Sequence, residues 1–414
     1  MHAALYAPGG FYARGEPPAR HFRTSVHVSP SYAVAIWELL RQVDAGLGHP
    51  GRIDLVDVGA GRGELLEQVL AAAGQGSAAG PGGAGAGGGG LVAEPGPAGE
   101  PGRAGVRQGG AGAGPGGAGE PGSAGEPGRA GAGPEGAEAE PERAGEPGSA
   151  GIPSADVAPG LAGRIAACAV EVAPRPAGLD PRIRWQPVPP TGITGLVIAN
   201  EWLDNVPLDV VELTAAGPAL VQVEPATGAE RPGCPPDPAD LDWVHAWWPL
   251  AARGDRAEVG RTRCEAWAAV IRRIDRGVAV AADYGHVKAA RPAWGTLTGY
   301  LEGRAVAPLP DGSRDITAHV ALDACAAAGA AAGAGESALT TQRAALRGLG
   351  LNARRPSLAL AVADPDGYAR ALSQASMNAE LVDPEGQGGF GWLAQAVGTS
   401  LPTALAKLTA DDPG

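Results

Sequence analysis

Residues 55–63 of the chain read LVDVGAGRG, an apolar run that ends in three glycines at alternate positions. The run RIDLVDV (52–58) has the length and character of a buried strand, and ELLEQVLAAA (64–73) follows with helical spacing. A Gly-rich turn between a strand and a helix exposes backbone N–H groups to a polar or anionic ligand. The stretch therefore predicts a ligand-binding turn at the end of a strand.

Asp57 indicates which ligand the turn holds. In the dinucleotide fingerprint G-x-G-x-x-G, the third glycine stands one place beyond Gly63, and a pyrophosphate would be repelled by a carboxylate at the head of the loop. An ammonium group would be attracted. S-adenosylmethionine (SAM) carries an ammonium and no phosphate, and Asp57 with Gly59, Gly61 and Gly63 resembles the first motif of Rossmann-like methyltransferases. The alternative is a tight turn whose glycines serve packing alone.

A second carboxylate, Glu171, ends the next predicted strand, RIAACAVEV (164–172). Dinucleotide folds use an acid at this place to bind ribose hydroxyls, so Glu171 is the expected ribose ligand. Residues 71–155 stand between the two acids. Without them, about 30 residues remain, the length of one strand-helix-strand unit.

The segment 71–155 is dominated by Gly, Ala, Pro and Glu and contains almost no large apolar residues. A segment of this composition buries too little apolar surface to compensate for the conformational entropy that it would lose on folding. We therefore predict a disordered, acidic surface insertion. Short Gly-X-Y runs within it also allow a collagen-like interpretation, but their register breaks repeatedly.

Further apolar runs predict the rest of the sheet, because runs without alternation indicate burial on both faces. The predicted fold class is α/β, a Rossmann-like doubly wound sheet of the class I methyltransferase type. The remaining strands are expected at 182–188, 195–200 and 277–283, with helices at 31–43 and 263–274 and a hairpin at 208–213 and 219–225.

The predicted organisation has five parts. They are an N-terminal extension that contributes to the active site (1–50), a Rossmann-like core (51–70 and 156–300), a small cap inserted in that core (about 208–262), the insertion (71–155) and a mostly helical C-terminal part (301–414).

Composition excludes several classes of partner and site. The net charge of −13 disfavours nucleic acid, which selects basic surfaces. No apolar run is long enough to cross a bilayer, and no secretory signal is visible, so we expect a cytoplasmic protein without membrane insertion. The four cysteines are far apart and form no C-x-x-C, which predicts buried thiols and no metal site.

The block VIANEWLDNVPLDVVEL (197–213) resembles the MidA-like SAM-dependent methyltransferases, a family that includes the mitochondrial protein-arginine methyltransferase assisting respiratory complex I assembly. Asn200, Glu201, Asp204 and Pro207 match the family's block at the end of the fourth strand. The pieces GGFYARG, TSVHVSPSYAVAI, ADYGH, GTL and RDITAHV are similar to other family blocks, in the same order, over most of the chain outside 71–155.

The resemblance implies SAM as the cofactor and a protein side chain as the acceptor, such as an arginine of a respiratory-complex subunit. The expected cofactor ligands are Asp57, Gly59, Gly61, Gly63, Glu171 and Asn200. The alternative function is that of an assembly or binding factor that has kept the fold but has weak or no activity.

Glu201 and Asp204 are the predicted catalytic residues. They follow the fourth strand at its carboxyl end, where ligands bind in such sheets, and paired carboxylates would orient a guanidinium. Capping of a following helix is the alternative for Asp204. Asp283 and His286, after the fifth strand, are the predicted acceptor-binding residues, with a structural role as the alternative for His286.

Overall fold

The computed structural model describes residues 1–7, 10–12, 24–78 and 160–406, which fall within one unit of the chain. Most of the predicted insertion, from 79 to 155, lies outside the described residues. Its predicted start was wrong, because α4 (Glu64–Ala78) continues through positions 71–78 as a helix. The alanines in this stretch favour the helical state over a loop.

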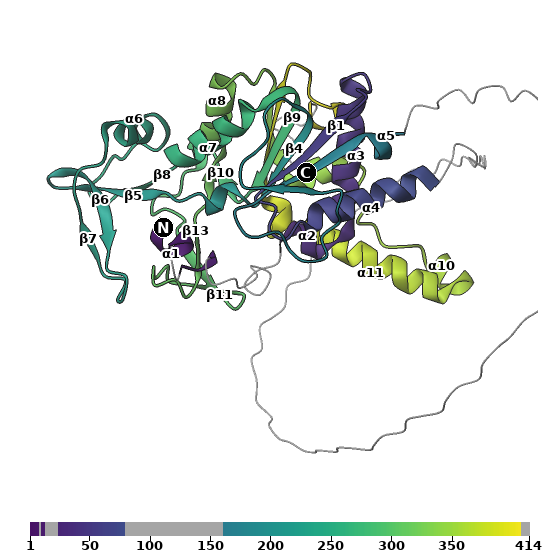
Figure 1. The fold of residues 1–414 in the computed structure, drawn as a ribbon. Helices are drawn as coiled ribbons and strands as arrows, with labels where there is room; N and C mark the ends of the chain where they lie inside the picture. The colour runs from purple at the N-terminus through teal and green to yellow at the C-terminus, as the bar shows by residue number, and fades with distance from the viewer. Residues whose placement is uncertain (8–9, 13–23, 79–159, 407–414) are drawn as a thin grey trace, which may run out of the picture. The chain divides into compact units, whose positions relative to one another are not determined.

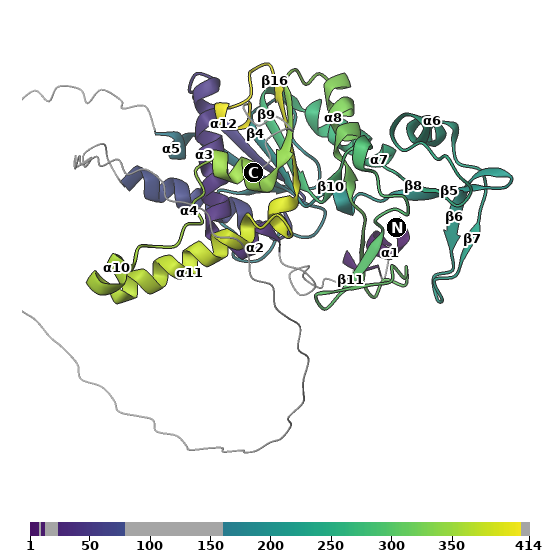
Figure 2. The ribbon, with the colours of Figure 1, turned by 180° about the vertical axis from the view of Figure 1, so that it is seen from behind.

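A seven-stranded sheet forms the centre of the fold, in the order β15-β16-β9-β4-β1-β2-β3 (Figures 1 and 2). All neighbouring strands pair in parallel except at β16, which runs antiparallel to both its neighbours. The predicted α/β, doubly wound sheet is confirmed. The strands are β1 (Ile53–Val58), β2 (Ile165–Val170), β3 (Arg184–Gln186), β4 (Ile193–Asn200), β9 (Ile274–Asp283), β15 (Ser337–Thr341) and β16 (Gly391–Val397).

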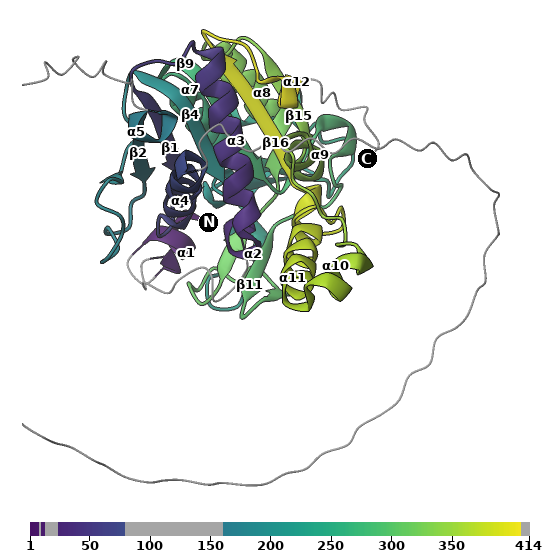
Figure 3. The same ribbon diagram turned by 90° about the vertical axis from the view of Figure 1, so that its right-hand side faces the viewer.

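Helices cover both faces of the sheet because its strands carry apolar residues on both sides. Ile53 and Leu55 of β1 pack with α3 (Pro30–Gly46) and α4, and α3 lies lengthwise across this face (Figure 3). Val56 and Val58 pack toward α7 (Arg261–Ile271) and α8 (Leu322–Ala331). The alternation along one strand thus divides the core into two layers.

The C-terminal region departs from the prediction of a mostly helical part. It does contain helices, but β15 and β16 complete the central sheet. Six of the seven residues of β16 are apolar or Gly, and its five central residues are buried, so this strand is a core element. Besides α8, the α-helices described in this region are α9 (Gln342–Gly348), α10 (Leu358–Ala363), α11 (Pro365–Leu381) and α12 (Thr403–Ala406).

The region predicted as a cap contains a second sheet, in the order β7-β6-β5-β8. The predicted hairpin is present, since β5 and β6 pair antiparallel. Figure 1 shows these strands grouped with α6. Their bounds are β5 (Asp209–Thr214), β6 (Gly217–Val223), β7 (Glu230–Pro232), β8 (Arg256–Val259) and α6 (Pro238–Trp247).

Short elements complete the described structure. No helix among the described residues combines the length and apolar character needed to cross a bilayer. The elements are α1 (His2–Tyr6), α2 (Ser25–Val28), α5 (Leu161–Arg164), β10 (Gly285–His286), β11 (Thr298–Leu301), β12 (Arg304–Val306), β13 (Asp315–Thr317), β14 (Val320–Ala321) and the single-turn helices η3 (Leu203–Asn205), η4 (Lys288–Ala290) and η5 (Gln387–Gly389).

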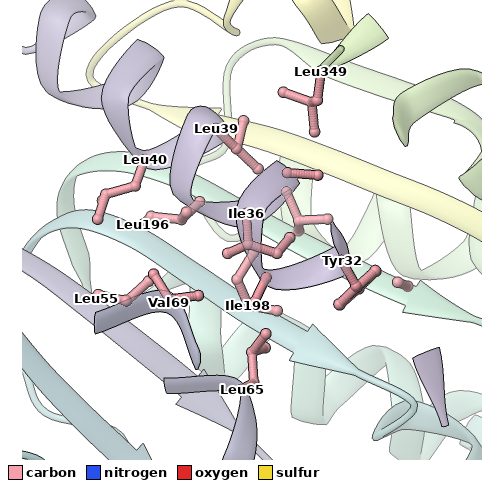
Figure 4. Close-up of a cluster of buried hydrophobic side chains, with 14 of the residues drawn as sticks. Tyr32, Ile36, Leu39, Leu40, Leu55, Leu65, Val69, Leu196, Ile198 and Leu349 are labelled. Carbon is pink, nitrogen blue, oxygen red and sulfur yellow. The ribbon is translucent and has the colours of Figure 1, made fainter. Parts of the chain in front are cut away.

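Helix α3 anchors one layer of the core. Its side chains Ile36, Leu39 and Leu40 are completely buried and lie among Leu55 of β1 and Leu196 of β4 (Figure 4). Burying a leucine side chain fully is worth about 1.5–3 kcal/mol. The helix therefore contributes to stability through one face, and its opposite face is free to vary.

We predict that Leu39→Ala lowers the free energy of unfolding by about 2–5 kcal/mol, because the lost contacts leave a cavity. Chemical denaturation monitored by circular dichroism measures this change. Val34→Ala, at a position of the same helix that is 53% exposed, is the matched control and should change stability by less than about 0.5 kcal/mol. Equal effects of the two substitutions would contradict the assignment of faces.

Candidate active site

The carboxyl ends of β1, β2, β4 and β9 meet at one edge of the sheet, and the predicted site residues follow these ends. The N–H groups of Gly59 and Ala60 donate to the carbonyl oxygen of Val170, at 3.0 and 3.2 Å, which ties the glycine loop to the end of β2. The N–H of Glu201 donates to the carbonyl oxygen of Ala282 at 2.8 Å, which ties the end of β4 to β9. Ligands bind at this edge in open α/β sheets.

All three loop glycines have positive φ, of 74° at Gly59, 57° at Gly61 and 85° at Gly63. A Cβ on Gly59 would lie 2.5 Å from Trp202 Cδ1, and one on Gly63 would lie 2.7 Å from Leu179 Cδ1. Packing against Trp202 and Leu179 thus explains why Gly59 and Gly63 carry no side chain. A Cβ on Gly61 would meet no atom within 4 Å, so packing does not explain Gly61, and the space beside it is open to a ligand.

Asp57 lies beneath the loop with only 3% of its surface exposed. Burial raises the pKa of this carboxyl to about 7, and the negative charges of Glu171 and Glu64 add to the effect. The hydrogen bonds of the described residues include none to its side chain. A carboxylate that is buried and accepts no described hydrogen bond would be stabilised in its charged form by a neighbouring cation. The site therefore fits a ligand that brings an ammonium group.

Glu171 stands at the end of β2, directly beside the open position at Gly61. Its Oε2 accepts a hydrogen bond from the Gly61 N–H at 3.1 Å. Its Oε1 accepts from the N–H groups of Val172 and Ala173, at 2.7 and 3.1 Å. These bonds hold the carboxylate at the loop, although its residue remains partly exposed.

Asn200, a predicted cofactor ligand, is engaged by the protein at both ends of its amide. The hydroxyl of Tyr32 donates to Asn200 Oδ1 at 2.5 Å, and Asn200 Nδ2 donates to Glu201 Oε1 at 3.1 Å. The residue thus connects α3 to the carboxylate of Glu201. Its role as a cofactor ligand stays a prediction.

Glu201 adopts an uncommon backbone conformation, with φ of 51°. Such a conformation costs about 1–3 kcal/mol in a residue other than glycine, and strain of this kind concentrates at functional sites. The N–H of Ser25 donates to Glu201 Oε1 at 2.9 Å. Burial raises the pKa of the Glu201 carboxyl to about 7, although the bond from Ser25 opposes the shift. The described hydrogen bonds use Oε1 and leave Oε2 for another partner.

Asp204 and Asp283 lie inside the protein, with 6% and 0% of their surfaces exposed. Asp204 belongs to η3 and does not cap an α-helix; its own N–H donates to Asp283 Oδ2 at 3.1 Å. Its carboxylate accepts from Thr317 Oγ1 at 2.8 Å and from Asn205 Nδ2 at 2.9 Å. Burial raises the pKa of both acids, and that of Asp283 well above its ordinary value. The structure surrounds both side chains with protein groups.

His286 packs against the cap. Its ring meets Trp248 edge-on with centroids 4.9 Å apart, and Arg291 Nη1 donates to its Nδ1 at 2.6 Å. Burial, together with the charge of Arg291, lowers the pKa of His286 to about 4, so the ring is neutral at neutral pH. These contacts favour the structural alternative; binding of the acceptor by His286 stays a prediction.

Sequence reasoning overlooked Arg263, which is 1% exposed and stands among the buried acids. Its guanidinium donates to four backbone carbonyl oxygens, those of Asp204, Val206, Ala318 and His319. In sequence this arginine stands two places after Arg261 in the first turn of a helix, so nothing in the local pattern distinguishes it. Tyr12, Tyr32 and Asp315 were also overlooked, although all three belong to blocks that carried the resemblance, GGFYARG, TSVHVSPSYAVAI and RDITAHV.

Comparison with known proteins agrees with this geometry. Residues 164–339 match the model of a family described as "Putative S-adenosyl-L-methionine-dependent methyltransferase". The predicted class is confirmed: a SAM-dependent methyltransferase. The predicted cofactor, SAM, is confirmed with it. No curated protein sequence matches this chain significantly.

Two crystal structures of COG1565 superfamily proteins from Burkholderia thailandensis resemble this methyltransferase in fold. One, bound to S-adenosyl-homocysteine, has a TM-score of 0.65 at 21% sequence identity, over 99% of this chain and 90% of that protein. The other, a native structure, has a TM-score of 0.64 at 22% identity, with the same coverage. This likeness confirms the class I methyltransferase fold.

We predict that Asp57→Asn stabilises the protein at pH 8 but not at pH 4. The pKa of Asp57 is about 7 in the folded protein, against about 4 in the unfolded chain. The folded state therefore holds the additional proton between these values, so the contribution of Asp57 to stability falls as pH rises from about 4 to about 7 and is constant above.

Thermal unfolding of the cofactor-free protein at the two pH values measures the effect. Asp275→Asn, at an exposed position of β9, is the matched control and should change the melting temperature little at either pH. A shift of equal size at pH 4 and pH 8 in Asp57→Asn would show that burial does not perturb this carboxyl.

Proposed function

We propose that this methyltransferase transfers the methyl group of SAM to a cationic side chain of a protein, with arginine as the favoured acceptor. The observation that carries the proposal is Glu201: a carboxylate on strained backbone, half-buried at the carboxyl end of β4, with one oxygen committed to Ser25 and Asn200. The cofactor supplies an electrophilic methyl group on a sulfonium. The residues of the chain must align the acceptor with it and exclude water.

On the cofactor side, we assign the ammonium end to Asp57 and the ribose hydroxyls to Glu171. Supporting this, Asp57 is buried without a described hydrogen-bond donor to its side chain, and Glu171 stands beside the open space at Gly61. Gly59 and Gly63 serve the shape of the turn, because Trp202 and Leu179 occupy the places where their side chains would be.

On the acceptor side, Glu201 would accept a hydrogen bond from the acceptor nitrogen and take up the proton that this nitrogen loses as the methyl group passes to it and S-adenosylhomocysteine leaves. A guanidinium is always charged and carries five N–H donors in a rigid plane, so one donor can bind Oε2 while others reach neighbouring acceptors, which favours arginine over lysine. The surroundings also favour a cation, since the buried acids Asp204, Asp283 and Asp315 outnumber Arg263, the buried cation beside them. Asp204 and Asp283 act through the turn that carries Glu201.

The resemblance found in the sequence suggests a respiratory-complex subunit as the acceptor protein. An assembly factor without activity is the second candidate, and it would use the same fold for binding alone. The strained backbone of Glu201 favours the enzyme, because such strain is retained where it assists a reaction. Methyl groups in the acceptor distinguish the two candidates.

Gly61→Val tests the cofactor side. We predict that it weakens SAM binding by at least about tenfold, because the side chain fills open space beside Glu171 and disfavours the positive φ. Isothermal titration calorimetry measures the affinity. Gly51→Val, at a glycine with ordinary φ and open surroundings, is the control and should bind SAM as the wild type does. Unchanged affinity in Gly61→Val would remove the assignment of the loop.

Glu201→Gln tests the acceptor side. We predict that methyl transfer falls by at least about 100-fold, the loss usual for a residue that handles the proton or charge of the reacting group. SAM affinity should stay within about twofold of the wild type, because Glu201 is assigned to the acceptor. Glu265→Gln, on the exposed surface of α7, is the matched control.

The measurement is transfer of tritium from methyl-labelled SAM to proteins of an extract made from cells that lack this gene. Amino-acid analysis of the labelled protein identifies the acceptor. Methylarginine supports the proposal, and methyllysine would correct the acceptor while keeping a cationic side chain. Full activity in Glu201→Gln would refute the role of this carboxylate.

A further inference from the structure

The N-terminal residues reach the turn that carries Glu201. The hydroxyl of Tyr12 donates to Asn205 Oδ1 at 2.5 Å and lies 3.2 Å from Asp315 Oδ1. The segment is held there by an apolar cluster, and Figure 1 shows α1 close to β13. The buried members of this cluster are Ala4, Leu5, Phe11 and Ile316.

The side-chain amide of Asn205 is occupied at both ends. Its Nδ2 donates to the backbone carbonyl oxygen of Glu201 and to Asp204 Oδ1, each at 2.9 Å. Both bonds require the nitrogen of the amide, and not its oxygen, to face Glu201 and Asp204. The two ends of an amide have nearly the same shape, so its partners together decide which way the group points: two acceptors hold Nδ2, and one further partner holds Oδ1. That partner is the hydroxyl of Tyr12.

The contact matters because Glu201 is strained. A residue with positive φ keeps this conformation only where its surroundings determine it. Two bonds fix the backbone of Glu201: its N–H donates to Ala282, and its carbonyl oxygen accepts from Asn205. The second of these depends on the orientation of the Asn205 amide.

We propose that Tyr12 is a positioning residue of the methyl-transfer site. By holding the Asn205 amide in one orientation, it keeps Glu201 in the strained conformation in which its carboxylate serves the acceptor. The inference rests on the function proposed above for Glu201, and it assigns Tyr12 no contact with the acceptor or the cofactor.

Tyr12→Phe tests the inference because it removes only the hydroxyl. Hydrogen–deuterium exchange of a peptide that covers residues 201–206 should become about tenfold faster, the effect of one lost hydrogen bond on local opening. The amides of Glu201 and Asn205, bonded to Ala282 and Trp202, report on this opening. The melting temperature should change little.

Tyr6→Phe is the matched control. Tyr6 belongs to the same segment and stacks on Tyr12 with centroids 5.5 Å apart, but its hydroxyl donates to the backbone oxygen of Asn205, at 3.0 Å. This bond is exposed to solvent and does not orient the amide, so its loss costs little and exchange over 201–206 should change less than about twofold. Equal acceleration in both variants would show that the segment acts by packing alone and would overturn the inference.

Turnover gives the second measurement. Methyl transfer from labelled SAM to extract proteins should fall about tenfold in Tyr12→Phe, with SAM affinity unchanged within about twofold. Asn205→Asp keeps the size of the side chain but removes its donor to Glu201, so it should reproduce both effects. This second variant decides the question if Tyr12→Phe does not fold.

Unchanged exchange over 201–206 in Tyr12→Phe and in Asn205→Asp would refute the role of Tyr12. The two proposals can fail separately. If the wild type transfers no methyl group to any protein, the proposed function fails, whereas the exchange experiment still decides whether Tyr12 fixes the backbone of Glu201.

Discussion

The site depends on a single carbonyl oxygen, that of Val170, which accepts hydrogen bonds from both Gly59 and Ala60. These bonds force the chain leaving β1 to turn over the end of β2. As a result, Asp57 is covered, and the N–H of Gly61 points to Glu171. Positive φ at three successive alternate residues is needed for this path, and only glycine adopts it without strain. The three glycines of the motif are therefore needed because the backbone takes this path between β1 and α4.

The second feature is an excess of buried acid at the same edge. Burial raises the pKa of Asp57, Glu201 and Asp315 to about 7. The guanidinium of Arg263 donates its hydrogen bonds to backbone carbonyl oxygens and not to these carboxylates. Without ligands, these carboxyls therefore hold their protons to higher pH than ordinary carboxyls do. A sulfonium cofactor with an ammonium end and a cationic acceptor would both bring the opposite charge, so the protein's unfavourable electrostatics become favourable when the site is filled.

Much of the fold could be predicted because β1, β4 and β9 are rich in apolar residues without strict alternation, which is typical of buried parallel strands. The motif acids follow these runs directly, so their place at one edge of the sheet was also predictable. β16 could not be predicted in this way, since its pairing between β9 and β15 is set by tertiary contacts. The same holds for the side chains of Asp204 and Asn205: neighbours in sequence cannot show that Thr317 and Tyr12 bind them.

The position of β16 has a consequence for biosynthesis. This strand is made after every other strand of the central sheet, yet it lies between β9 and β15 and supplies the sheet partner of β15. Until this strand has been synthesised, the N–H and carbonyl groups along one edge of β9 have no strand to pair with. The side chains of β9, most of which are buried in the folded protein, stand beside this open edge. Open ladders of this kind recruit other chains. A nascent chain that stalls before residue 391 would therefore need a chaperone.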